Sequence, residues 1–370
     1  MKRKEFYALG IMSGTSLDGL DFSLIRSDGL NYVKIIKNEY YKFSLKIREE
    51  LSSLIKFSDL NKSISSYDIF KKTNIKFSNY VNKKIQFFFS NLNLNRQKPD
   101  LIGFHGNTIV HNPKKKISIQ LGDPFFIAKK TNTPVVVNFR NRDINMSGQG
   151  APLVPVYHKA IFAKSKKKII VVNIGGISNY SFLDGKNKVL ASDIGPGNTL
   201  IDRFCIEKFN KLFDRNGLLA SKGKIDYNLV SRWVNKRIFH TKNPISFDIK
   251  NFKYSEFCQE NKKKNEDLLR TLTFFSAKLI SDLQYKIDAK IDYWIFTGGG
   301  TKNPILMGDI KDLLGEKNVF LSDEFGFDSG FIESCAFAFI SIRTLKKLPS
   351  AFPKTTGCKK KNICGNLFKP

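Results

Sequence analysis

An apolar strand, a glycine-rich polar turn and a returning strand occur twice in this chain, and this repeat constrains the fold more than any other feature. In the first copy, residues 6–12 form the apolar run and residues 21–27 the returning strand, with Gly14 and Gly19 between them. Glycine permits positive φ angles and lets a ligand approach the backbone closely. The pattern is typical of a β-hairpin rather than of a strand-to-helix loop.

The second copy begins at residues 169–172, where an apolar strand leads into a turn that contains Gly175 and Gly176. Residues 180–183 form the returning strand, and residues 189–192 form a third strand that precedes a predicted helix. The first copy likewise continues with a third strand and a helix. The repeat predicts an α/β protein of two similar subdomains that face each other across a cleft, each offering a hairpin to the phosphates of a nucleotide.

The first turn carries the chemistry of a phosphate and metal site. Successive N–H groups, together with the hydroxyls of Ser13, Thr15 and Ser16, can hold phosphate oxygens. The carboxylates of Asp18 and Asp21 would repel phosphate unless a divalent cation stood between them, and Mg²⁺ is the usual one. An ordinary Gly/Asp hairpin is the alternative. A P-loop is excluded because the Gly-Lys-Ser/Thr ending is missing.

A third glycine-rich strand end follows the predicted strand at residues 293–296. Gly298, Gly299 and Gly300 lie between this strand and a predicted helix. Three small residues there permit close approach of a flat group such as a nucleobase with its ribose. Alone the signal is weak, but as the third glycine-rich strand end of one nucleotide cleft it is stronger.

Three titratable side chains stand at positions that favour a functional role. Asp193 follows the strand at residues 189–192, where a carboxylate can act as a general base or can merely anchor the turn. His105 follows the buried strand predicted at residues 101–104, and ligands of α/β sheets bind at such strand ends. A hydrogen-bonded structural histidine is the equal alternative. Glu333 lies among apolar residues of a predicted helix, where a carboxylate is rarely left unpaired.

A polar stretch with two arginines predicts a second ligand site. Arg140 and Arg142 precede a glycine-rich segment, residues 147–155, that contains Gln149. Forked guanidinium donors suit anionic or hydroxyl-rich ligands. Surface salt bridging is the alternative, and the apolar strand in front of the arginines disfavours it.

Length and composition limit the class of protein. A chain of 370 residues suits two domains, and we expect a first subdomain over residues 1–135, a second over 136–345, and a tail, 346–370, that packs back on the first. Neither a leading apolar segment nor an apolar run of ~18 residues is present, so neither a signal peptide nor a membrane span is expected. Five cysteines without zinc spacing indicate reduced thiols in a cytosolic protein.

The net charge of +29 raises the hypothesis of a nucleic-acid partner. The lysines are spread along the chain, however, and no nucleic-acid motif accompanies them. A solvated basic surface is the better interpretation, and we expect no nucleic-acid partner.

In their order along the chain, the motifs closely resemble those of the anhydro-N-acetylmuramic acid kinase family, within the actin-like and hexokinase-like ATPase superfamily. The matching stretches are GIMSGTSLDGLD, GFHGNT, SIQLGDP, FRNRDINMSGQGAPLVP, VVNIGGISN, SDIGPGNTLID and TGGGTKNP. Two departures are minor: Asn107 stands where the family commonly has Gln, and Asn138 where an Asp is usual. The second departure weakens any metal or sugar role for residue 138.

The resemblance implies two ribonuclease-H-like (actin-like ATPase) subdomains facing across a nucleotide cleft, in a cytoplasmic, homodimeric enzyme of peptidoglycan recycling. Such an enzyme uses ATP and Mg²⁺ to open the 1,6-anhydro ring of anhydro-N-acetylmuramic acid and to phosphorylate O6. The products are N-acetylmuramic acid 6-phosphate and ADP. O6 carries no proton in the anhydro sugar, so a base would act on a water that attacks C1 while O6 leaves toward the γ-phosphorus.

The resemblance and the turn chemistry together assign the site residues. Asp193 matches the family's catalytic aspartate, and Asp18 and Asp21 are expected to hold the metal. The residues expected to bind ATP are Gly14, Thr15, Ser16, Leu17, Asp18, Gly19, Leu20, Asp21, Gly175, Gly176, Gly298, Gly299 and Gly300. Those expected to bind the sugar are His105, Arg140, Arg142, Gln149 and Glu333.

Two other functions remain open from the sequence. A kinase of another sugar would carry the same motifs, since substrate choice depends on the shape of the pocket. A non-catalytic actin-like nucleotide switch or filament subunit is the second. The segment with Arg140 and Arg142 argues against it, because a pure switch needs no second polar ligand site.

Overall fold

The computed structural model describes residues 4–14, 17–60, 67–92, 98–163, 166–240, 244–258 and 264–370. The chain forms two compact units, one of Met1–Ile161 with Glu333–Pro370 and the other of Phe162–Ile332. These bounds differ from those expected from the sequence, since residues 136–161 and 333–345 belong to the first unit together with the tail.

The first unit is built on a seven-stranded sheet in the order β12-β6-β4-β1-β2-β3, with β5 paired to β4. The first three strands pair antiparallel, whereas β4 runs parallel to β1 and β6 parallel to β4. The strands are β1 (Phe6–Ser13), β2 (Gly19–Ser27), β3 (Val33–Lys42), β4 (Leu101–Asn112), β5 (Ile117–Leu121), β6 (Val135–Val137) and β12 (Asn366–Phe368).

The second unit repeats this topology with five strands in the order β11-β10-β7-β8-β9. The pairs β7–β8 and β8–β9 are antiparallel, and β10 is parallel to both β7 and β11. The strands are β7 (Ile169–Ile174), β8 (Ile177–Leu183), β9 (Val189–Pro196), β10 (Tyr293–Thr297) and β11 (Val319–Leu321). The orders β3-β2-β1-β4-β6 and β9-β8-β7-β10-β11 correspond strand for strand. The predicted repeat of two ribonuclease-H-like α/β subdomains is confirmed.

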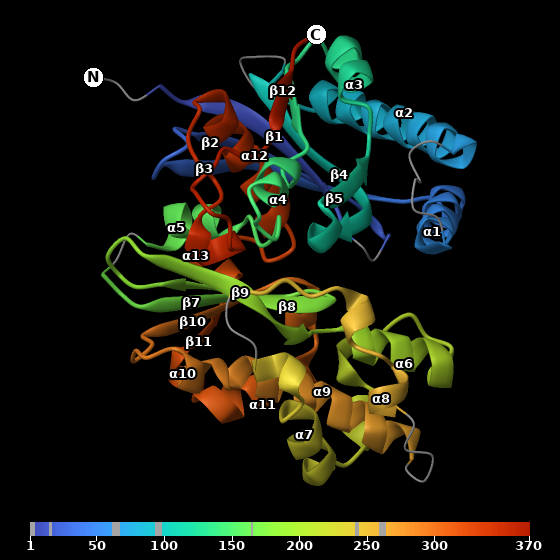
Figure 1. Ribbon diagram of the computed structural model, residues 1–370, viewed down its shortest axis with the longest axis vertical. Coiled ribbons are helices and arrows are strands. Elements are labelled where there is room, and N and C mark those ends of the chain that lie inside the picture. Colours follow the sequence, from blue (N-terminus) through green and yellow to red (C-terminus); the bar gives the residue numbers. More distant parts are fainter. Residues whose placement is uncertain are drawn as a thin grey trace. The chain divides into compact units, whose positions relative to one another are not determined.

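Helices cover both sheets (Figure 1). In the first unit they are α1 (Leu45–Leu60), α2 (Asp68–Ser90), α3 (Pro124–Thr131), α4 (Asn141–Asn145), α5 (Pro155–Phe162), α12 (Ile332–Leu345) and α13 (Pro353–Thr356). In the second they are α6 (Thr199–Phe209), α7 (Tyr227–Val234), α8 (Ser255–Cys258), α9 (Asn265–Ser281), α10 (Leu283–Lys286) and α11 (Pro304–Leu314). In the described part of the chain, no helix combines the length and apolarity that crossing a membrane requires.

The alternation of side chains along β1 explains how the first sheet is covered on two faces. Leu9 and Ile11 are fully buried in a core that includes Phe77 of α2. Gly10 faces α12 instead, where a Cβ atom would lie 1.8 Å from the carbonyl oxygen of Ser334. The missing side chain is what allows α12 to lie directly on the strand.

The second unit has its own core between its sheet and α9. Ile170 and Val172 of β7 are fully buried, and they belong to one apolar cluster with Leu272 and Phe275 of α9. These helix residues are three positions apart, which places them on one face. The apolar stripe of α9 is therefore core, and the helix ends at Ser281, where α10 follows.

Two predictions about secondary structure were wrong. β4 does not end at residue 104 but runs to Asn112, because its second half pairs with β5 in an antiparallel hairpin. The register between β1 and β4 also shifts there, so that His105 is the additional residue of a β-bulge. Asp193 does not follow a strand that ends at residue 192, because β9 continues to Pro196 and Asp193 lies within it. In the tail, α13 forms and β12 pairs with β6.

Candidate functional site

The β1–β2 turn is tied to the neighbouring strand β4. Ser13 and Asn107 lie opposite each other in the register of these strands. Asn107 is fully buried, and its Nδ2 donates to the Ser13 Oγ at 2.9 Å and to the Gly14 carbonyl at 3.2 Å. These bonds hold the end of β1 from which the turn begins. Thr15 and Ser16, both expected to bind phosphate, lie outside the described residues.

The other residues of this turn divide into packing residues and exposed ones. Leu17 and Leu20 are buried, so their side chains belong to the core. At Gly19 a Cβ atom would lie 2.5 Å from the Tyr41 carbonyl oxygen. Packing against β3 is therefore enough to explain the glycine at this position. Asp18 is exposed and Asp21 half-buried.

Asp18 and Asp21 act on the same neighbour, the Tyr40 phenol. Burial, then the two carboxylate charges, raise the pKa of Tyr40 to about 12. Across the described residues, no group of three or more His, Cys, Asp or Glu side chains comes together as a metal site. Two carboxylates fit Mg²⁺ by their chemistry, because this ion takes one or two carboxylates besides phosphate oxygens and water.

The β7–β8 turn is held by the start of α6. The Gly175 carbonyl accepts the N–H of Asn198 at 2.9 Å, and the Gly176 carbonyl accepts the N–H groups of Gly197 at 2.9 Å and Thr199 at 3.1 Å. The Thr199 hydroxyl adds a bond of 2.6 Å to Gly176. The second hairpin thus has a fixed shape within its unit.

Asp193 lies in β9, opposite Asn179 of β8. Its Oδ2 accepts the N–H of Phe247 at 2.7 Å, and its own N–H donates to the Ile245 carbonyl at 3.0 Å. These bonds hold residues 245–247 against β9, so Asp193 anchors a segment remote in sequence rather than the turn after its own strand. The bond from the Phe247 N–H orients the carboxylate, which a general base requires.

The glycines after β10 have different surroundings. At Gly298, where φ is 89°, a Cβ atom would lie 2.3 Å from the Asn173 Oδ1. At Gly300 it would lie 2.2 Å from the Ile174 Cγ2, whereas no atom comes within 4 Å at Gly299. Gly298 and Gly300 are needed for packing against the end of β7, and Gly299 faces open space.

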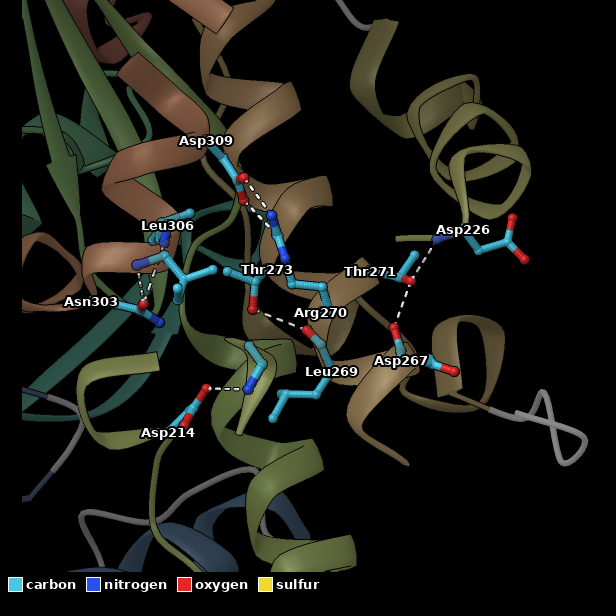
Figure 2. Close-up of polar contacts among 12 residues, drawn as sticks. Asp214, Asp226, Asp267, Leu269, Arg270, Thr271, Thr273, Asn303, Leu306 and Asp309 are labelled. Atoms are coloured by element: carbon cyan, nitrogen blue, oxygen red, sulfur yellow. Dashed lines mark hydrogen bonds and ion pairs between the residues drawn. The ribbon is translucent and has the colours of Figure 1, made fainter. Parts of the chain in front are cut away.

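Polar contacts fix the helices behind this turn, as Figure 2 shows. The Asn303 side chain caps α11 by accepting the N–H of Leu306 at 3.3 Å. Arg270 of α9 and Asp309 of α11 form a partly buried two-bond ion pair at 2.6 Å. Asp214 accepts the backbone N–H groups of Leu219 at 2.9 Å and Ala220 at 3.0 Å. Aspartate is a common residue at such turns, because its carboxylate accepts nearby backbone N–H groups.

Within the first unit, His105 and Arg140 form a connected pair. Arg140 Nε donates to His105 Nε2 at 3.0 Å, and its NH1 donates to the Gly150 carbonyl at 2.8 Å. Since Nε2 accepts, His105 Nδ1 carries the proton and donates to the Gly106 carbonyl at 3.0 Å. Burial and the Arg140 guanidinium hold the pKa of His105 well below its ordinary value, so the imidazole is neutral.

Glu333 lies in the electrostatic surroundings of Arg140, and the two remaining predicted sugar residues, Arg142 and Gln149, lie on the segment between Arg140 and Gly150. Burial raises the pKa of Glu333, and the positive charge of Arg140 opposes the shift. Arg142 is exposed on α4, and Gln149 is half-buried in the following loop. The structure thus bonds His105 to Arg140, and the charge of Arg140 reaches Glu333.

Sequence reasoning missed Asp143, a fully buried carboxylate beside this cluster. Its Oδ2 accepts the Gly150 N–H at 2.8 Å, and its Oδ1 accepts from the Thr356 hydroxyl at 2.7 Å and the Asn362 Nδ2 at 3.1 Å. The only local signal was an acidic residue at the start of a glycine-rich segment. Its two partners in the tail are remote in sequence.

Comparison with known proteins identifies the family. The family model "Anhydro-N-acetylmuramic acid kinase" matches residues 6–370. Proteins of that name from Rhodopseudomonas palustris and Pasteurella multocida are 34% and 31% identical to this chain, over 98% and 100% of it and 99% and 98% of their own lengths. The protein of that name from Pelagibacter ubique is 35% identical over 99% of both chains. The chain belongs to the anhydro-N-acetylmuramic acid kinase family.

Proposed function

We propose that this protein is an ATP-dependent kinase that hydrolytically opens the 1,6-anhydro ring of anhydro-N-acetylmuramic acid and phosphorylates O6. The products are N-acetylmuramic acid 6-phosphate and ADP, and the role is recovery of cell-wall sugar. The observation that carries the proposal is the Asp193 carboxylate, held by the Phe247 N–H in the unit that also contains the Gly175–Gly176 hairpin.

In this proposal ATP is bound by three glycine turns. Gly14 to Asp21 and the Gly175–Gly176 hairpin take the phosphates, and the open side of Gly299 takes the adenosine. Asp18 and Asp21 would hold Mg²⁺, which supplies positive charge against the phosphate oxygens. Phosphoryl transfer then depends mainly on positioning and charge stabilisation.

Asp193 is the proposed base. A water molecule attacks C1 of the sugar and gives its proton to the Asp193 carboxylate. The C1–O6 bond breaks, and O6 takes that electron pair to the γ-phosphorus as the bond to ADP breaks. No proton has to be removed from O6, because it carries none in the anhydro sugar.

The sugar is proposed to lie against His105, Arg140 and Glu333, with Arg142 and Gln149 at the edge of the same site. A neutral His105 accepts from Arg140 and thereby fixes the plane of the guanidinium. A fixed planar fork of donors suits carboxylate and hydroxyl oxygens. We further propose that the protein is a homodimer and that it is cytoplasmic. The five cysteines, all free thiols, are in keeping with the proposed location.

The test is a paired time course of ADP formed and anhydro sugar lost, for the native protein and for Asp193→Asn. Asparagine can still accept the Phe247 N–H but cannot take a proton, so turnover should fall by about 10²–10⁴-fold while ATP still binds. The native protein should consume one ATP for each ring opened. Ring opening without ATP, or a near-normal rate in Asp193→Asn, would contradict the mechanism.

A further inference from the structure

We infer that Asp143 is a positioning residue for the sugar side of the site, and that the C-terminal tail completes that side. We call Asp143, Thr356 and Asn362 the tail clamp. The inference rests on the proposed function for its kinetic consequences but on hydrogen bonds alone for its geometry.

Asp143 is the centre of the clamp. Its side chain is 0% exposed, and each of its carboxylate oxygens has a defined donor. Oδ1 accepts from the Thr356 hydroxyl at 2.7 Å and from the Asn362 Nδ2 at 3.1 Å, and Oδ2 accepts the Gly150 N–H at 2.8 Å. A buried carboxylate is tolerated only with such donors. The Asp143 carboxylate therefore binds both the tail and the loop that contains Gly150.

The backbone of the tail also binds the loop formed by residues 146–150. The Gln149 N–H donates to the Thr356 carbonyl at 2.7 Å, and the Lys359 N–H donates to the Met146 carbonyl at 3.0 Å. Within the loop, the Gly148 N–H donates to the Asp143 carbonyl at 2.8 Å. The loop is bound at both ends and in its middle.

Gly150 connects the clamp to the residues that we assign to the sugar. Its N–H is bound to Asp143, and its carbonyl accepts from Arg140, which in turn donates to His105. Gly150 has a φ of 68°, and at Gly148 a Cβ atom would lie 2.2 Å from the Asp143 Oδ2. The loop has little room to shift without moving Arg140. Release of the tail from Asp143 should therefore misplace the guanidinium that we assign to the sugar.

Thr356→Val is the sharpest test, because it removes one donor to Asp143 and keeps the size of the side chain. Thr355→Val is its matched control in the same short helix. The Thr355 hydroxyl donates to the Phe352 carbonyl at 3.1 Å and accepts the Phe352 N–H at 3.3 Å, and the Thr356 hydroxyl shares this carbonyl at 3.4 Å, so the control removes the contacts of Thr355 to Phe352 and keeps the bond to Asp143. Thr356→Ser keeps the donor and should behave like the native protein. In Asp143→Asn the new amide N–H₂ would face one of the N–H or O–H donors that now bind the carboxylate, which disfavours folding. The variants of the tail are therefore used for the test.

For Thr356→Val we expect the KM for the anhydro sugar to rise about tenfold, as expected when one bond to a buried charge is lost. The KM for ATP should stay within about twofold, because the bonds of the clamp described above run to the loop at residues 146–150. An unchanged KM for sugar, or an equal rise in Thr355→Val, would overturn the inference.

Amide hydrogen exchange of residues 146–150 provides a readout that does not need turnover. Exchange at Gly148, Gln149 and Gly150 should be faster in Thr356→Val than in Thr355→Val or Thr356→Ser. Equal exchange in Thr356→Val and Thr355→Val would overturn the clamp. Absence of sugar turnover in the native protein would instead refute the proposed function, and the exchange comparison would still decide the clamp.

Discussion

At the scale of single residues, Gly299 and Gly300 are neighbours in one turn with different surroundings. A side chain at residue 300 would meet Ile174 of β7, whereas residue 299 has space around it. One glycine is explained by packing within the unit, and the other is left available to a ligand. The two positions can be separated by experiment.

Gly299→Val should leave folding intact and weaken ATP binding at least tenfold, because the new side chain occupies the space proposed for adenosine. Gly300→Val should instead destabilise the protein by about 1–3 kcal/mol through overpacking. Calorimetry with ATP and thermal melting distinguish the two effects. Unchanged ATP affinity in Gly299→Val would remove this turn from the proposed nucleotide site.

Asp202 of α6 is a second residue whose surroundings predict a measurable effect. Burial raises the pKa of its carboxyl from 3.8 to about 7. The folded state therefore binds a proton that the unfolded state has already lost between these two pH values, so ionisation opposes folding. The destabilisation is absent below pH 4, grows as the pH rises to about 7, and is complete above it.

Asp202→Asn removes the titration, and its melting temperature should exceed that of the native protein at pH 8 by more than at pH 5. Melting curves of both proteins at the two pH values measure this difference. A constant difference across the range would show that Asp202 ionises normally in the folded protein.

At the scale of elements, the contact of α12 with β1 and β4 organises the first unit. A Cβ atom at Gly103 of β4 would lie 2.4 Å from the Phe337 carbonyl oxygen. The helix presents small residues there, Ser334, Ala338 and Ser341, and Ser334 shares a hydrogen bond of 2.7 Å with Ser23 of β2. Glu333 is held at the start of this helix, so helix placement and site geometry depend on the same contact.

Gly103→Ala should lower the free energy of unfolding by about 1–3 kcal/mol, because the added methyl group meets helix backbone that cannot move aside. Gly308→Ala in α11 is the matched control, since no atom lies within 4 Å of the position of its Cβ. There alanine should stabilise the helix by up to about 1 kcal/mol. Urea denaturation of both variants should show opposite signs, and a neutral Gly103→Ala would contradict the packing argument.

At the scale of the whole molecule, the chain passes between its two units twice, at the end of α5 and at the start of α12. If ATP and sugar engage both units as proposed, binding should draw the units together, as in other enzymes with hinge closure. Small-angle scattering should give a smaller radius of gyration with an ATP analogue plus sugar than with neither. An identical profile at saturation would count against closure.

Much of the fold was predictable because it depends on local sequence patterns, namely the spacing of apolar residues and the residues at turns. The strands of both repeats follow from the spacing of apolar residues over a few positions and from the glycines of the turns between them. The length of β4 was not predictable in this way. From residue 108 on, all its residues except Ile109 are half-buried, and this part is a strand because β5 returns to pair with it.

By itself the sequence determined two α/β repeats, three glycine turns and the family motifs, since periodicity and turn chemistry act between near neighbours. The tertiary structure decided which groups meet. Asp143 and Thr356 are 213 residues apart, and Gly10 meets Ser334. It also decided which glycines are packed and which is open. Such contacts depend on how distant elements stack, and no local pattern records that.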